Sequence, residues 1–207
     1  GCGGGGEAPT EPEPGDVGIR FDAATNTWWG TNDWIEYRVG TLPLVFSAGH
    51  GGSLEPSEIP DRSGPGIVTV RDSRTIETTL AAADAVEALV GGRPHVIISH
   101  LRRTKLDPNR GLSEAALGNP LAERAWAEYH GFIDSAKVAV TAANGTGLYL
   151  DMHGHGHEID RLELGYLLTR SDLFYRADSI MDRDDGAETS LRALAARTDE
   201  PFSAILR

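Results

Sequence analysis

Short apolar runs alternate with long amphipathic segments through most of this chain. Continuous apolar runs of this length are typical of strands buried on both faces, and they cover residues 42–46, 96–98, 148–150 and 162–168. Apolar side chains recur at helical spacing over residues 73–90, which predicts a helix. A second helix is predicted from Asn119-Pro120, a capping residue followed by a first-turn proline, to Asn144-Gly145, where the glycine ends it. The alternation predicts an α/β fold, with a mostly parallel or mixed sheet flanked by helices.

The two ends of the chain depart from this pattern. Residues 1–16 are rich in glycine, proline and glutamate and predict a flexible linker. Residues 34–39 alternate apolar and polar positions, which predicts a hairpin or edge strand. A helix is expected over residues 189–196, and the apolar segment after Pro201 stops at residue 207, so we expect further C-terminal elements to be missing. Residues 17–207 are expected to form one α/β domain.

Composition narrows the classes of partner. The chain has 207 residues, 19 basic against 31 acidic, and a formal charge of −12. No dense Lys/Arg tract is present, so we expect no nucleic-acid partner. No apolar run reaches the ~18–20 residues of a membrane-spanning helix.

The single cysteine, Cys2, follows a glycine and precedes four more. This end resembles the cleavage site of a bacterial lipoprotein signal, in which the cysteine carries the lipid and a tether follows. That resemblance implies an extracytoplasmic enzyme held at the cell envelope, with membrane contact only through the anchor. The alternative is a chance cysteine in a linker and a cytoplasmic protein.

Polar side chains follow three of the predicted strands. His50 comes soon after residues 42–46, Arg103 and the Asp107–Arg110 stretch follow residues 96–98, and Asp151 and His153 close residues 148–150. The carboxyl ends of neighbouring parallel strands meet at one edge of a sheet, where α/β proteins bind ligands. The sequence therefore predicts one site at this rim.

Two histidines and a carboxylate are a usual ligand set for catalytic zinc. Asp151 and His153 are two residues apart, so Asp151 can accept the ring proton of His153. His155 and His157 follow closely, and spacing alone leaves open which imidazole ligates. Glu163 interrupts an apolar run, which predicts either a functional carboxylate or an ion pair with Arg161.

The order of these motifs resembles the N-formylglutamate amidohydrolase family, which is similar in fold to zinc carboxypeptidases. The matching stretches cover roughly residues 42–170: Ser47–Gly52 with Ile59–Arg62, Asp72-x-x-Thr75-x-Glu77, Arg103–Arg110, and Asp151–Gly154.

The resemblance implies a role for each residue of the set. His50, Glu77 and His153 would bind Zn²⁺, with Glu55 as a rival carboxylate ligand. Glu163 would be the general base and Arg103, with Arg102 beside it, would lie near the developing oxyanion. The substrate carboxylate would be held by Asn109 and Arg110.

These expectations describe a zinc-dependent amidohydrolase acting on a small, acidic N-acyl amino acid. A metallocarboxypeptidase that trims cell-wall or other peptides is a second interpretation, and it suits an extracytoplasmic location. A surface lipoprotein that binds metal or ligand without turnover is a third, from a different class of protein.

Overall fold

A computed structural model describes residues 18–158 and 162–165. The chain divides between Gly156 and His157 into two units, and each is described by itself. The first unit contains all the helices and strands of the described residues. None of the described helices is long and apolar enough to cross a membrane.

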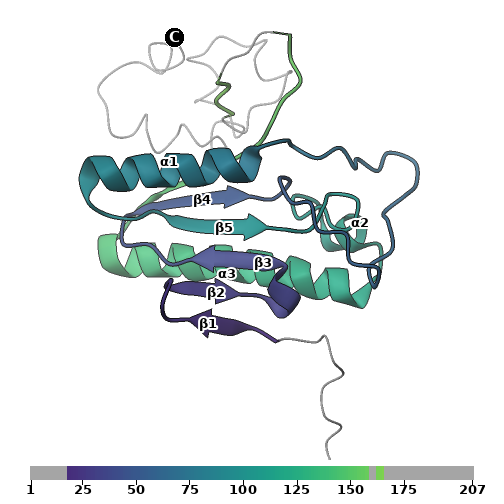
Figure 1. The fold of residues 1–207 in the computed structure, drawn as a ribbon, viewed down its shortest axis with the longest axis horizontal. Helices are drawn as coiled ribbons and strands as arrows, with labels where there is room; N and C mark the ends of the chain where they lie inside the picture. Colours follow the sequence, from purple (N-terminus) through teal and green to yellow (C-terminus); the bar gives the residue numbers. More distant parts are fainter. Residues whose placement is uncertain (1–17, 159–161, 166–207) are drawn as a thin grey trace, which may run out of the picture. The chain divides into compact units, whose positions relative to one another are not determined.

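The first unit is built on a six-stranded sheet in the order β1-β2-β3-β5-β4-β6 (Figure 1). Its strands are β1 (Arg20–Asp22), β2 (Thr27–Trp29), β3 (Ile35–Arg38), β4 (Leu44–Ala48), β5 (His95–Ser99) and β6 (Leu148–Asp151). A short 3-10 turn, η1 (Thr31–Asp33), lies between β2 and β3. The sequence prediction of strands at residues 42–46, 96–98 and 148–150 is confirmed within two residues at each end.

The sheet is mixed rather than mostly parallel. β4 is parallel to β5 and β6, while β1, β2 and β3 join β5 through antiparallel pairings. The reason is local, because four- and five-residue gaps between β1, β2 and β3 are too short for the crossover that parallel neighbours require. The expected hairpin at residues 34–39 is confirmed, but β3 is paired on both sides and is not an edge strand.

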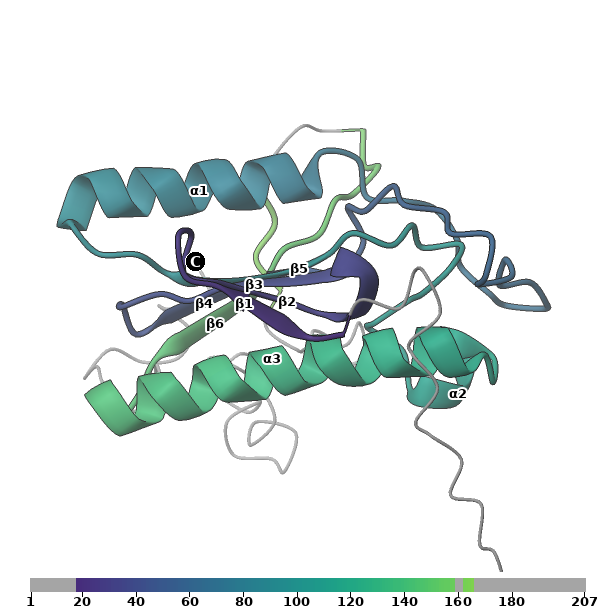
Figure 2. The same ribbon diagram turned by 60° about the horizontal axis from the view of Figure 1, so that its bottom comes forward.

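Helices cover both faces of the sheet. α1 (Thr75–Val90) lies over one face and α3 (Pro120–Asn144), preceded by the short α2 (Leu112–Ala116), lies over the other (Figure 2). Strand β5 contributes side chains to the hydrophobic cores on both faces of the sheet. Val96 and Ile98 pack towards α1, while Ile97 packs towards α3. The sequence prediction of strands buried on both faces is confirmed there.

The ends of the two long helices agree with the sequence. The Asn119 side chain accepts hydrogen bonds from the backbone N–H groups of Leu121 and Ala122, with Pro120 in the first turn. α1 ends at Gly91, which has the left-handed backbone (φ 75°) that glycine adopts without strain.

Some sequence predictions fall on other parts of the chain. Residues 162–165 carry no regular element, and the rest of the strand expected over 162–168 lies outside the described residues. The linker with Cys2 and the helix expected at 189–196 also lie outside them.

Candidate metal centre

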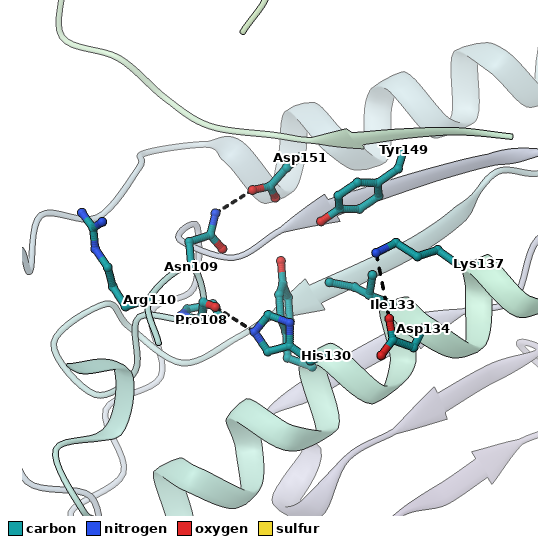
Figure 3. Close-up of a pocket in the computed structure, with 10 residues that line it drawn as sticks. Pro108, Asn109, Arg110, His130, Ile133, Asp134, Lys137, Tyr149 and Asp151 are labelled. Atoms are coloured by element: carbon teal, nitrogen blue, oxygen red, sulfur yellow. Dashed lines mark hydrogen bonds and ion pairs between the residues drawn. The ribbon is translucent and has the colours of Figure 1, made fainter. Parts of the chain in front are cut away.

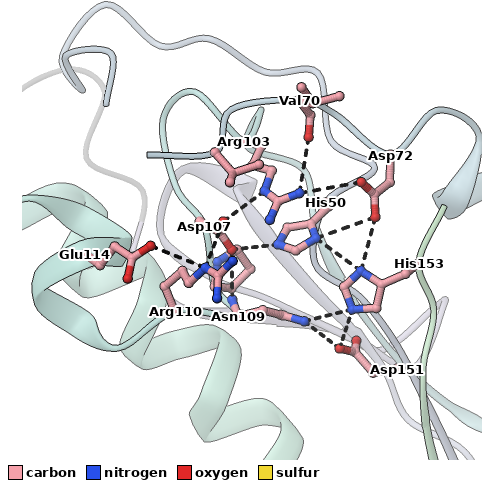
Figure 4. A network of polar contacts seen from close by, with 12 residues as sticks. His50, Val70, Asp72, Arg103, Asp107, Asn109, Arg110, Glu114, Asp151 and His153 are labelled. Carbon is pink, nitrogen blue, oxygen red and sulfur yellow. Dashed lines mark hydrogen bonds and ion pairs between the residues drawn. The ribbon is translucent and has the colours of Figure 1, made fainter. Parts of the chain in front are cut away.

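Three side chains meet at the carboxyl edge of the parallel strands. His50 follows β4 by two residues, His153 follows β6 by two residues, and Asp72 lies in the loop before α1. Together they form a group of potential metal ligands (Figure 4). His50 is buried, Asp72 is half-buried and His153 is exposed, so the triangle they form has one open side.

The backbone brings these segments together. Asp72 donates its backbone N–H to the carbonyl oxygen of His50 (3.1 Å), and Gly154 donates its N–H to the Asp72 carboxylate (3.1 Å). Gly52 lets the chain after β4 approach β5 closely, because a Cβ there would lie 2.3 Å from the carbonyl group of His100. A glycine is therefore needed two residues after the first candidate ligand.

The donor atoms have the spacing of a small metal site. His50 Nδ1 lies 3.2 Å from His153 Nδ1 and 3.6 Å from Asp72 Oδ2, and His153 Nδ1 lies 3.1 Å from the same oxygen. Ligands about 2.0–2.1 Å from a tetrahedral ion are separated by about 3.3 Å. The three atoms therefore match one face of a coordination tetrahedron. Imidazole nitrogen favours a transition metal over magnesium or calcium.

Carboxylates fix which ring nitrogen of each histidine faces this point. His50 Nε2 donates to Asp107 Oδ1 (2.7 Å), and His153 Nε2 donates to Asp151 Oδ2 (2.8 Å). An ionised carboxylate can only accept, so each Nε2 carries a proton. His153 Nδ1 faces a second carboxylate, that of Asp72 (3.1 Å), so in the metal-free protein this nitrogen also carries a proton, which a metal ion would displace. With that proton displaced, two Nδ1 lone pairs and a carboxylate oxygen face one point, an arrangement that suits a cation.

A buried aspartate, Asp107, forms a charged pair with Arg103 beside the candidate centre. Asp107 is 0% exposed and accepts a hydrogen bond from Arg103 Nε (2.8 Å) as well as from His50. Burial alone would raise the pKa of Asp107, but these two hydrogen bonds outweigh it and hold the pKa well below its usual range.

The pKa of the exposed histidine is shifted in the opposite direction. The hydrogen bond with Asp151 is the main cause, and it raises the pKa of His153 to about 9, while burial opposes the shift. Burial would raise the pKa of Asp151 itself, but hydrogen bonds with His153 and Ser47 lower it. In the absence of metal, a proton on His153 therefore offsets part of the acidic charge.

Most of the site residues predicted from the sequence lie around the candidate metal centre. His50, His153, Arg103, Asn109 and Arg110 lie around this centre, and the predicted Asp151–His153 hydrogen bond is present. Asn109 donates to Asp151 Oδ2 (2.6 Å), and Arg103 also contacts Asp72 (3.7 Å). Both side chains are therefore engaged within the site.

Neither glutamate proposed as a metal ligand reaches the two histidines. Glu77 is exposed on α1, because the buried positions of that helix are Thr75, Thr79 and Ala83 and Glu77 lies on the opposite side. Glu55 forms an exposed ion pair with Arg102 (2.9 Å). The carboxylate that meets the histidines is Asp72, five residues before Glu77, because the loop and not the helix face approaches the rim.

Glu163 belongs to the second unit, where its carboxylate accepts a hydrogen bond from His157 Nδ1 (2.8 Å). Its assignment as general base stays a prediction.

Sequence reasoning left the structural roles of Asp72 and Asp107 unassigned, although both stood in the motifs singled out. Their signal was position: Asp72 opens the Asp72–Glu77 motif and Asp107 the Asp107–Arg110 motif, and each motif begins in the loop that follows a parallel strand. Comparison with family models, with curated proteins and with solved structures finds no match for this chain.

Proposed function

We propose that this protein is a zinc-dependent hydrolase that cleaves the amide bond of a small carboxylate-bearing substrate, as its resemblance to N-formylglutamate amidohydrolases implies. The observation that supports the proposal best is the convergence of His50 Nδ1, His153 Nδ1 and Asp72 Oδ2 at 3.1–3.6 Å from one another. Each imidazole is backed by its own carboxylate, as is usual for metal-binding histidines.

The residues of the chain have distinct tasks in this proposal. His50, Asp72 and His153 hold the ion, and Asp107 and Asp151 keep the two rings in the ligating tautomer. When bound, zinc lowers the pKa of a water molecule to about 7 and polarises the scissile carbonyl group. The exposed side of His153 leaves room for that water and for the substrate.

Arg110 is the cation best placed to bind the substrate carboxylate. Its ion pairs with Glu114 and Asp107 are long, at 3.3 and 3.9 Å, so its guanidinium can take a better partner. Arg103, in contrast, is held by Asp107 and by the backbone of Val70, and it fixes the position of the carboxylates around His50. Proton transfer to the leaving amine is assigned to Glu163 by the resemblance.

Metal analysis and turnover test this proposal together. We expect about one zinc ion per chain, hydrolysis of N-formylglutamate or a related N-acyl amino acid, and loss of that activity on chelation and in His153→Ala. Glu163→Gln should retain zinc but lose turnover. Protein that binds no transition metal would refute the proposal, whereas bound zinc without hydrolysis of N-acyl amino acids or peptides would favour a binding protein.

A further inference from the structure

A pocket of about 350 Å³ adjoins the metal centre in the first unit (Figure 3). It is lined by the Pro108–Arg110 segment, the middle of α3 and the end of β6. Asn109 and Asp151 line this pocket and also contact His153 at Nε2, the ring nitrogen opposite the metal-facing Nδ1. The pocket therefore lies beside the candidate metal centre and shares these two residues with its surroundings.

A buried hydroxyl group in this pocket lacks a partner. Tyr129 is 1% exposed, and its hydroxyl makes no hydrogen bond with any residue among 18–158 and 162–165. Ser47 lies near enough to Tyr129 to lower its pKa slightly, but the geometry of a hydrogen bond between them is poor, because the Ser47 hydroxyl is engaged with Tyr149 and Asp151. Burial and the charge of Asp151 raise the pKa of Tyr129 well above its usual value, so the hydroxyl keeps its proton and can donate it. Leaving such a buried donor unsatisfied is unfavourable, and a ligand acceptor would relieve that cost.

Two cations lie at opposite ends of the pocket, Arg110 at one and Lys137 at the other (Figure 3). Lys137 is 51% exposed, and its ammonium lies 5.1 Å above the ring of Tyr149. Its ion pair with Asp134 is 3.9 Å long, which is beyond hydrogen-bond length. Ammonium and guanidinium groups are donors only, so both ends of the pocket suit anionic acceptors.

We propose that Lys137 and Tyr129 form a specificity subsite that binds a carboxylate at the end of the substrate remote from Arg110. The subsite rests on the proposed hydrolase function, and it goes further by assigning two residues of α3 to substrate selection. Lys137 supplies the charge, and the Tyr129 hydroxyl supplies a directed hydrogen bond from the buried wall. Asn109 and Asp151 connect this subsite to the metal centre.

Calorimetric titration of zinc-loaded and metal-free protein with simple acids tests the subsite. Dicarboxylates from malonate to adipate are compared with monocarboxylates of the same chain length. We expect the best dicarboxylate to bind at least tenfold more tightly than its monocarboxylate counterpart. Lys137→Met should remove that preference without changing monocarboxylate binding, and Lys137→Arg should retain most of it. Arg124→Met, which removes the same charge from an exposed position on the same helix, should leave the preference intact.

Tyr129→Phe separates a ligand role from a structural one. The hydroxyl has no partner among the described residues, so its removal should leave the free energy of unfolding unchanged or slightly raised while weakening dicarboxylate binding several-fold. Loss of stability with unchanged binding would overturn the role of Tyr129. A wild-type preference below twofold, or one that survives Lys137→Met, would overturn the subsite. Absence of zinc or of turnover with the preference intact would refute only the hydrolase proposal.

Discussion

At the residue scale, one buried carboxylate controls the geometry of the candidate centre. Asp107 joins His50 to Arg103 and is fully enclosed. Asp107→Asn keeps the shape but removes the charge that faces both the half-buried Arg103 and the buried Arg62, and Arg103 keeps only its longer contacts with Asp72 and Val70. We expect it to lower the free energy of unfolding by about 3–5 kcal/mol and zinc affinity by about 10–100-fold, measured by denaturant titration and metal competition.

The matched control for this substitution is Asp134→Asn on the exposed side of α3. It should change stability by no more than about 0.5 kcal/mol. Equal effects of the two substitutions would show that Asp107 does not organise the site.

His153 gives the metal-free protein a specific pH dependence. Its pKa is raised in the folded state to about 9 from 6.5, chiefly by Asp151. A raised pKa stabilises the folded state fully below pH 6.5 and ceases to do so as the pH rises through about 9. Metal-free protein should therefore lose stability between these values, and zinc, which displaces the proton, should bind about tenfold more tightly per pH unit over the same range.

Denaturant unfolding at pH 6.5 and pH 9 checks the effect, with His153→Gln as the comparison. The variant should lose less stability over this range than the wild type. A loss of the same size in both would assign the pH dependence to other groups.

At the scale of elements, the loop between β4 and α1 positions Asp72 and is anchored by Arg62. The buried Arg62 guanidinium donates to the carbonyl oxygens of Val68, Arg103 and Glu114. Arg62→Met should leave these acceptors unsatisfied, so we expect faster proteolysis within the loop and weaker zinc binding. Removing the α3 cap with Asn119→Ala should cost about 1 kcal/mol without changing zinc affinity. Loss of zinc affinity in both variants would trace the effect to general destabilisation.

At the scale of the whole molecule, the ligands come from three segments that only the folded first unit brings together. Zinc should therefore bind the folded state selectively and stabilise it by about 2.7 kcal/mol at a concentration of 100 Kd. For a chain of this size the thermal midpoint should rise by roughly 5–10 °C. Scanning calorimetry of metal-free protein with and without zinc measures the shift, and His153→Ala should abolish it. An equal shift in that variant would place the bound metal elsewhere.

The sequence by itself determined the three parallel strands and the two long helices of the first unit, and the edge at which the polar residues gather. Apolar runs and helical spacing are local patterns, so they located β4, β5, β6, α1 and α3, and the strand ends placed His50 and His153 at one rim. Sequence could not fix the pairing direction of the N-terminal strands or the carboxylate that meets the histidines. The carboxylate depends on how the long loop before α1 folds back on the sheet. A backbone hydrogen bond from Asp72 to His50 brings that aspartate to the histidines, while the buried face of α1 points Glu77 away from them. Tertiary structure also decided which ring nitrogens face the metal, because Asp107 and Asp151 act from separate segments of the chain.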